Sequence, residues 1–247
     1  MLNICYATSC HYEKYVNHFK NKLLDSYLKS NIDIPLFVDT NRIDLFDIEY
    51  LKEQNVIIFD TYELQDDISK KLELLPLEPL PYIYYKWNLR RFIAKKCAEL
   101  GYNVILYSDS DTTLVDNINV KEEIESIYEP NTFKSSAYIW DYNELPDNSV
   151  FRNLFRYMKD FPEWKFNLSS LKAIDGWSNY YMGKTPEDIV NLINTWSDIL
   201  YKTHDLDYGD IDFFIENQSM ALNLNKWEIS HCRTFHIVKH EVHDRYE

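Results

Sequence analysis

Tyr-Tyr-Lys-Trp-Asn-Leu-Arg-Arg-Phe-Ile-Ala-Lys-Lys-Cys-Ala-Glu-Leu-Gly-Tyr-Asn-Val-Ile-Leu-Tyr-Ser-Asp-Ser-Asp-Thr-Thr-Leu-Val, residues 84–115, is the stretch that decides the fold. It reads as a basic helix, a tight turn, a strand and an acidic tip. The consecutive apolar residues within Asn103–Tyr107 predict a strand that is covered on both faces, as strands of parallel sheets are. We therefore expect an α/β protein.

The acidic tip carries two carboxylates immediately after this strand. Asp109 and Asp111 stand two residues apart at its carboxyl end, which is a good oxygen-ligand site for Mg²⁺ or Mn²⁺ beside a phosphate. Lys86 and Arg90 share a face of the preceding helix at i, i+4 spacing and could help to offset phosphate charge.

The first quarter of the chain supports a parallel sheet. Three segments have strand character: Leu2–Thr8, Ile34–Asp39 and Val56–Asp60. An amphipathic helix is predicted over Glu13–Lys29 by apolar residues that recur at three and four. Alternation of strand and helix implies parallel pairing with right-handed crossovers. Ligands of such sheets bind at the carboxyl ends of the strands, which here carry Thr8, Asp39, Asp60 and Asp109.

The second half has a different pattern. Helices are predicted over Val120–Tyr128 and Val150–Met158, and strands over Ser135–Trp140 and Tyr180–Lys184. Thr185 is a predicted N-cap for a helix that reaches about Tyr201, because Pro and two acidic residues follow it. The segment 160–181 is dense in aromatic residues, which either fill the core or stack on sugar rings, and core packing is the better-supported interpretation of any single one.

Composition narrows the class of protein. The 247 residues can bury a full core, and we expect one domain with a donor half (1–115) and an acceptor half (116–247). The net charge of −14 argues against nucleic-acid binding. No apolar run is long enough for a transmembrane segment, and no signal sequence is evident, so we expect a soluble, cytoplasmic protein. The four glycines form no dinucleotide-binding or P-loop motif.

Two further clusters are candidates for chemistry. On a helix that starts near Asp210, the carboxylates of Asp212 and Glu216 lie one turn apart and could act as general base or charge stabiliser, with a solvated first turn as the equally good alternative. The C-terminal segment carries His231, His236, His240 and His243, each of which is more often a surface residue than a metal ligand.

Three motifs taken in order carry a resemblance to a known family. Ser108-Asp109-Ser110-Asp111 after an apolar strand resembles the Asp-x-Asp signature of GT-A fold glycosyltransferases. The segment 177–184 is similar to the Asn-Ser-Gly-x-x-x-Gly strand of that family, with Trp177 in place of Asn and Asn179 in place of Gly. The segment 216–223 is similar to its acidic-Gln-x-x-Leu-Asn helix. The family has a Rossmann-like, mixed and mainly parallel sheet flanked by helices.

The resemblance implies a metal-dependent sugar transferase that uses a UDP- or GDP-sugar donor and a carbohydrate or glycoconjugate acceptor. It implies these roles. Asp109 and Asp111 bind Mn²⁺ or Mg²⁺, with His236 as a third ligand; in the alternative arrangement Asp109 holds the ribose or the donor sugar. Thr8 and Asp39 hold the nucleoside, and Lys86 or Arg90 contacts phosphate or donor. Asp212 or Glu216 is the catalytic carboxylate. Retaining and inverting chemistry both stay open.

Two other classes of protein remain compatible with the sequence. Asp109-Ser110-Asp111-Thr112-Thr113 also contains the Asp-x-Asp-x-Thr pattern of metal-dependent phosphatases, although that motif usually follows the first strand, and nucleotidyltransferases also present Asp-x-Asp to a metal. An inactive carbohydrate-binding module with the same fold is the alternative outside enzymes.

Overall fold

The computed structural model describes most of the N-terminal half and selected segments of the C-terminal half. The described residues are 1–30, 32–64, 92–116, 118–135, 139–141, 172–174, 178–203, 227–231 and 237–239. The statements below concern these residues.

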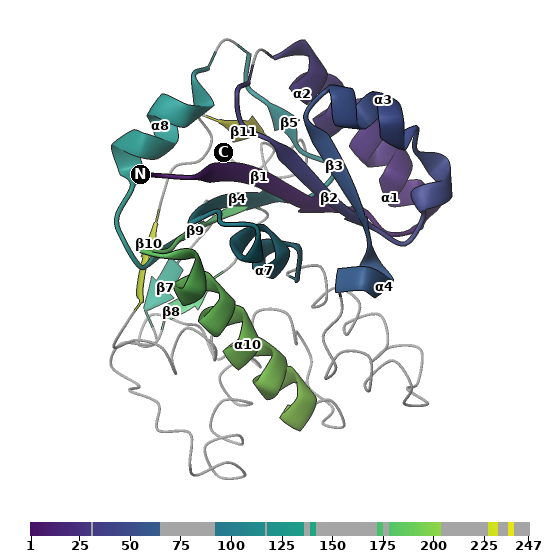
Figure 1. Cartoon of the computed structure of the whole chain (residues 1–247). Helices are drawn as coiled ribbons and strands as arrows, with labels where there is room; N and C mark the ends of the chain where they lie inside the picture. The colour runs from purple at the N-terminus through teal and green to yellow at the C-terminus, as the bar shows by residue number, and fades with distance from the viewer. Residues whose placement is uncertain are drawn as a thin grey trace.

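A seven-stranded sheet forms the centre of the molecule (Figure 1). Its order is β10 (Glu228–His231), β6 (Thr132–Ser135), β9 (Ser178–Met182), β4 (Val104–Ser108), β1 (Ile4–Ser9), β2 (Leu36–Thr40) and β3 (Val56–Asp60). β9 runs antiparallel to its neighbours β4 and β6, while the other strand pairs are parallel. The predicted fold class, α/β with a mixed and mainly parallel sheet flanked by helices, is confirmed.

Helices cover both faces of this sheet (Figure 1). On one face lie α1 (Tyr12–Phe19), the π-helix Lys20–Leu24, α2 (Asp25–Lys29) and α8 (Val120–Ile127). Their apolar side chains share a buried cluster with Tyr6 of β1 and Leu106 of β4. On the other face, α7 (Phe92–Glu99) packs against β1, β2 and β4, and α10 (Pro186–Thr203) packs against α7. Successive strand residues point to opposite faces, so strands buried on both sides are apolar throughout.

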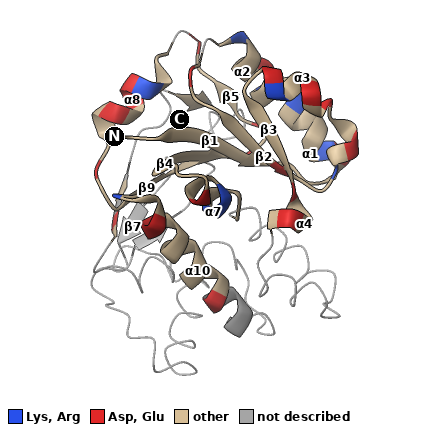
Figure 2. Ribbon diagram, viewed as in Figure 1, with Lys and Arg blue, Asp and Glu red and all other residues tan. Residues whose placement is uncertain are grey.

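Two small sheets, two short α-helices and a 3-10 helix (Ile43–Leu45) complete the described structure. β5 (Thr113–Leu114) pairs antiparallel with β11 (Val238–Lys239), and β7 (Ile139–Asp141) pairs antiparallel with β8 (Lys172–Ile174). The helices α3 (Ile48–Glu53) and α4 (Thr61–Leu64) flank β3 in the sequence. Charged residues lie mainly on the helices, whereas the sheet ribbon is largely free of them (Figure 2).

Several sequence predictions can be compared directly with these elements. The predicted strands of the first half are present with shifts of one or two residues at their ends, and the helix over Glu13–Lys29 is present with a π-helical segment at its centre. Thr185 caps α10 as predicted, because its hydroxyl accepts the backbone N–H of Asp188 at 3.4 Å while the Asp188 carboxylate accepts the backbone N–H of Thr185 at 3.0 Å.

The single strand predicted over Ser135–Trp140 is wrong. β6 begins at Thr132 and ends at Ser135, while Trp140 belongs to β7 in a separate sheet. The strand β6 was not predicted because the charged Lys134 interrupts its apolar pattern. In the folded chain its ammonium group forms an ion pair with Glu129 at 2.9 Å, which allows the residue to be buried.

Other predictions lie partly or wholly outside the described residues. The helix over Val150–Met158 lies outside them, and the basic helix expected from Tyr84 is described only from Phe92 as α7. The division into donor and acceptor halves stays a prediction, although described strands from both halves share one sheet. Among the described helices, none combines the length and apolar character of a membrane span.

Candidate functional site

The site is built at the edge of the sheet where the parallel strands end. Ser9, Thr40, Asp60 and Ser108 are the last residues of β1, β2, β3 and β4. Because β9 runs the other way, its first residue, Ser178, lies opposite Ser108 at the same edge. Polar side chains therefore follow one another along this edge, which is where open α/β sheets bind ligands.

An acidic turn follows β4, and in it buried hydroxyl residues alternate with partly exposed aspartates. Ser108, Ser110 and Thr112 are buried, whereas Asp109 and Asp111 remain partly exposed. The turn is closed on the Asp109 carbonyl oxygen, which accepts the backbone N–H of Thr112 at 3.3 Å and its hydroxyl at 2.8 Å. The hydroxyls thus face the protein, whereas the two aspartates are the more exposed residues of the turn.

Buried hydroxyl groups support this turn from inside the protein. Thr8 donates its hydroxyl to the carbonyl oxygen of Ser108 at 2.8 Å. The Ser108 hydroxyl lies 2.9 Å from the Thr112 hydroxyl and 2.5 Å from the phenol oxygen of Tyr6. Tyr6, Thr8, Ser108 and Thr112 are all fully or almost fully buried. Thr8 therefore acts on the turn through the backbone of Ser108.

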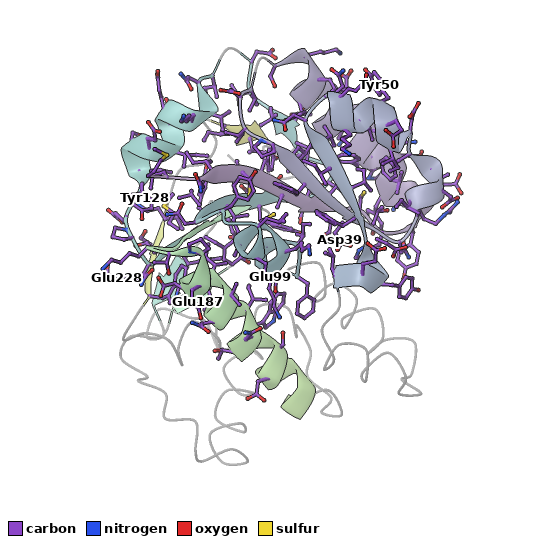
Figure 3. The ribbon with its side chains drawn as sticks, in the orientation of Figure 1. Asp39, Tyr50, Glu99, Tyr128, Glu187 and Glu228 are labelled. Atoms are coloured by element: carbon purple, nitrogen blue, oxygen red, sulfur yellow. The ribbon has the colours of Figure 1, made fainter. Side chains whose placement is uncertain are left out.

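A second polar group, the Asp39 cluster, joins the ends of β1, β2 and β3. It consists of His11, Asp39 and Thr61. Thr61 donates its hydroxyl to Asp39 Oδ1 at 2.5 Å, and His11 Nε2 lies 3.1 Å from Asp39 Oδ2 and 3.0 Å from the Thr61 oxygen. Figure 3 places Asp39 where the strands meet α4. Both carboxylate oxygens of Asp39 are therefore occupied within the protein.

This arrangement fixes which nitrogen of His11 carries the proton. Since the Thr61 proton is directed to Asp39, His11 Nε2 must donate to this pair, and in the neutral ring Nδ1 is then an acceptor. Asp39 is 1% exposed and His11 is 11% exposed. Within the described part of the chain, Nδ1 has no hydrogen-bond partner. His11 is thus the member of the cluster that can meet a ligand.

The loop after His11 is held in an unusual conformation. Tyr12 has φ of +65°, in the left-handed region, which costs a residue other than glycine about 1–2 kcal/mol. Its backbone N–H donates to Asn41 Oδ1 at 2.9 Å, which ties the loop to the end of β2. The rings of Tyr12 and Tyr62, which follow His11 and Thr61 in the sequence, are 43% and 54% exposed. Exposed aromatic rings thus flank the cluster in the chain.

The structure brings together only part of the predicted site. Thr8, Asp39, Asp109 and Asp111 lie at one edge of the sheet, on the adjacent strands β1 and β2 and on the acidic turn that follows β4. The other predicted site residues lie outside the described residues: Lys86, Arg90, Asp212, Glu216 and His236. His11 and Thr61 were not predicted, although Thr61 comes directly after β3 and His11 two residues after the end of β1, which is the signal that would have identified them.

No group of three or more His, Cys, Asp and Glu side chains that could hold a metal ion occurs among the residues that the structure describes. Asp109 and Asp111 are therefore joined by no third His, Cys, Asp or Glu ligand from this part of the chain. This donor set fits a cation that completes its shell with phosphate oxygens and water, as Mg²⁺ commonly does.

The C-terminal strand β11 runs beside the acidic turn. Val238 pairs with Leu114 and Lys239 pairs with Thr113, while the N–H of Val115 donates to the Ile237 carbonyl at 2.8 Å. Because the pairing is antiparallel, Ile237 lies beside Val115 and Lys239 lies beside Thr113, the residue nearer to the acidic turn.

The fold and the site together define an α/β protein with an acidic turn and a buried His-Asp-Thr cluster at the carboxyl edge of its sheet. No protein-family model matches the chain, and no curated protein matches it. Among solved structures, the chain is similar to mouse xyloside xylosyltransferase 1 in its apo form, at 11% sequence identity and a TM-score of 0.49. That similarity covers 93% of this chain and 84% of the other.

Proposed function

We propose that the chain is a metal-dependent glycosyltransferase that moves a sugar from a nucleotide-diphosphate donor to an acceptor hydroxyl. The observation that carries the proposal is the acidic turn of Asp109 and Asp111, two strands away from the Asp39 cluster along one edge. Two strand spacings are about 10 Å, a span that a nucleoside diphosphate can bridge.

The acidic turn is the proposed diphosphate end of the site. Asp109 and Asp111 would hold Mn²⁺ or Mg²⁺ together with phosphate oxygens. The bound ion would supply Lewis acidity to the leaving diphosphate, on which negative charge develops. This role needs both carboxylates on the ligand side of the turn, which agrees with the burial of the intervening serine.

The Asp39 cluster is the proposed nucleoside end. Asp39 would act there through His11, because its own oxygens accept hydrogen bonds from His11 and Thr61. The His11 Nδ1 acceptor suits a base with a ring N–H, which uracil and guanine have and cytosine lacks. The exposed rings of Tyr12 and Tyr62 come from the neighbouring positions and could stack on a base.

The remaining roles are proposals that rest on the family resemblance. Lys86 and Arg90 would neutralise phosphate or hold the donor, and His236 would be a further metal ligand. Asp212 or Glu216 would be the carboxylate that faces the acceptor hydroxyl, where a general base or a charge stabiliser is needed. Among these candidates, the one whose removal abolishes transfer but leaves donor binding intact would be the catalytic carboxylate.

The test is donor cleavage by the full chain. The protein is incubated with a panel of nucleotide-sugars, with Mn²⁺ or with a chelator, and release of the nucleoside diphosphate is followed. We expect slow, Mn²⁺-dependent hydrolysis of a UDP- or GDP-sugar that is lost in Asp111→Ala. Asp116→Ala is the matched control, since Asp116 is an exposed carboxylate just beyond the turn.

Two outcomes would decide against the proposal. Release of phosphate from simple monoesters, with no cleavage of any nucleotide-sugar, would identify a phosphatase that uses the same turn. Sugar binding without any nucleotide binding, with or without metal, would identify a carbohydrate-binding module.

A further inference from the structure

A directional chain of hydroxyl groups runs from the interior to the acidic turn. Thr112 uses its single hydroxyl proton to bond the Asp109 carbonyl at 2.8 Å. Ser108 then donates toward the turn, to the Thr112 hydroxyl at 2.9 Å and more weakly to the Asp109 carbonyl at 3.4 Å. With the Ser108 proton used in this way, Tyr6 must be the donor in the 2.5 Å contact between Tyr6 and Ser108. Each bond therefore fixes the direction of the next.

The hydroxyl groups in this series are all closed off from water. Tyr6, Ser108 and Thr112 are at 0% exposure. Burial raises the pKa of the Tyr6 phenol well above its ordinary value, so the phenol keeps its proton and remains a donor at neutral pH. No water can replace a lost hydroxyl at such a position without opening the packing. The orientation of the turn thus depends on the protein's own groups.

The sequence of the turn shows why this support matters. Asp109 and Asp111 are separated by the buried Ser110 and are followed by the buried Thr112. A change in the backbone at Asp109 would therefore move both carboxylates, because they belong to one short closed turn. Hydrogen bonds of buried hydroxyl groups strengthen one another in a low-dielectric interior.

We propose that Tyr6 is a positioning residue that holds the Asp109–Asp111 turn in the geometry required to bind a divalent cation. This inference rests on the proposed function, and it adds a residue on β1 that does not touch the ligand. Tyr6→Phe should keep the aromatic ring in place and remove only the first donor in the series of hydroxyl groups.

A purely structural role for the phenol makes a different prediction, and Tyr27 provides the matched control. Tyr27 is also a buried tyrosine in the same apolar cluster, and its hydroxyl donates to the Ile34 carbonyl at 2.8 Å, away from the turn. Tyr27→Phe should therefore lower thermal stability about as much as Tyr6→Phe does, without affecting cation binding.

The experiment measures Mn²⁺ binding to the full chain directly, from the electron paramagnetic resonance signal of free Mn²⁺. We expect Tyr6→Phe to weaken binding about two- to tenfold, as expected for the loss of one buried hydrogen bond. Thr112→Val should weaken it similarly, Thr112→Ser should restore it, and Tyr27→Phe should leave it unchanged. Equal affinities for Tyr6→Phe and the wild type would overturn the inference.

The outcome separates this inference from the proposed function. If the wild type binds no Mn²⁺, or if Asp111→Ala binds it equally well, the proposed function fails and the inference fails with it. If the wild type binds Mn²⁺ through Asp111 and Tyr6→Phe does not alter binding, only the inference fails. Amide hydrogen exchange provides a readout without metal: Tyr6→Phe, unlike Tyr27→Phe, should speed exchange at Thr112, and unchanged exchange would also contradict the inference.

Discussion

Thr61 is the residue through which the Asp39 cluster can be tested most sharply. Its hydroxyl donates to the Asp39 carboxylate and lies 3.0 Å from His11. Thr61→Val keeps the branched shape of the side chain and removes the donor. The carboxylate then loses one of its two partners in a place that water does not reach, because Asp39 is 1% exposed.

The expected cost follows from these contacts. A hydrogen bond to a charged group contributes about 1.5–3 kcal/mol, so we expect Thr61→Val to lower the free energy of unfolding by about 2 kcal/mol. Thr61→Ser keeps the hydroxyl and loses one methyl group, which costs about 0.8 kcal/mol. Thr40→Val is the control, because Thr40 is also buried but its hydroxyl has only uncharged partners: it donates to the Cys10 carbonyl, which is worth about 1 kcal/mol, and accepts the backbone N–H of Arg42.

The assay is urea unfolding of the four proteins at neutral pH, with the free energy obtained by linear extrapolation. The expected order of stability loss places Thr61→Val first, with Thr40→Val and Thr61→Ser close together below it. If Thr61→Val were no less stable than Thr61→Ser, the hydroxyl would not be bonded to the carboxylate, and the cluster as described would be refuted.

Three further predictions concern other parts of the molecule. Because the proposed function makes His236 a further metal ligand, His236→Ala should raise the Mn²⁺ concentration needed for activity more than His240→Ala does. Burial raises the pKa of Tyr27 to about 12 from 10, so the folded state keeps a proton that the unfolded state loses, and the free energy of unfolding should fall between these pH values, less so in Tyr27→Phe. Gly183→Ala should lower stability by about 1–3 kcal/mol, measured by thermal unfolding, because the added Cβ would lie 2.5 Å from a backbone carbonyl oxygen.

Each of these predictions has a result that contradicts it. A larger effect of His240→Ala would contradict the role of His236 as a metal ligand. Parallel stability curves for Tyr27→Phe and the wild type above pH 10 would show that the phenol is not buried as described. A Gly183→Ala variant as stable as the wild type would show that the turn between β9 and α10 has room for a side chain.

The elements that the sequence predicted well are those whose pattern is local. The segment Val104–Ser108 is apolar at consecutive positions, and the four strands of the parallel half follow the same rule. The start of α10 was predicted because Thr185, Pro186 and Asp188 each have a local reason to be there. Such signals need no knowledge of distant contacts.

The features that escaped prediction depend on contacts between distant residues. Asp39 reads in the sequence as an acid at a strand end that is free to hold a nucleoside. The fold buries it between His11 and Thr61, which are 28 and 22 residues away. The local sequence pattern does not indicate that both carboxylate oxygens of Asp39 accept hydrogen bonds from within the protein. The same applies to Tyr6, which reads as an ordinary core residue of β1 until its phenol is seen to reach Ser108.

The order of the strands at one edge of the sheet also could not be predicted from local sequence patterns. β6 and β10 pair in parallel, although about a hundred residues separate them, and the charged Lys134 interrupts the pattern of β6. The sequence predicted a mainly parallel sheet. Which strands are neighbours in the second half of the sequence is known only from the structure.

The most direct measurement is a calorimetric titration of UDP and GDP into the full chain, with Mn²⁺ and with chelator, for the wild type and for Asp111→Asn. If the proposed donor site exists, at least one of these nucleotides binds in the presence of Mn²⁺, and either chelation or Asp111→Asn weakens binding by about tenfold or more. If neither nucleotide binds under any condition, or if binding is indifferent to both Mn²⁺ and Asp111, the account of a metal-dependent donor site is contradicted.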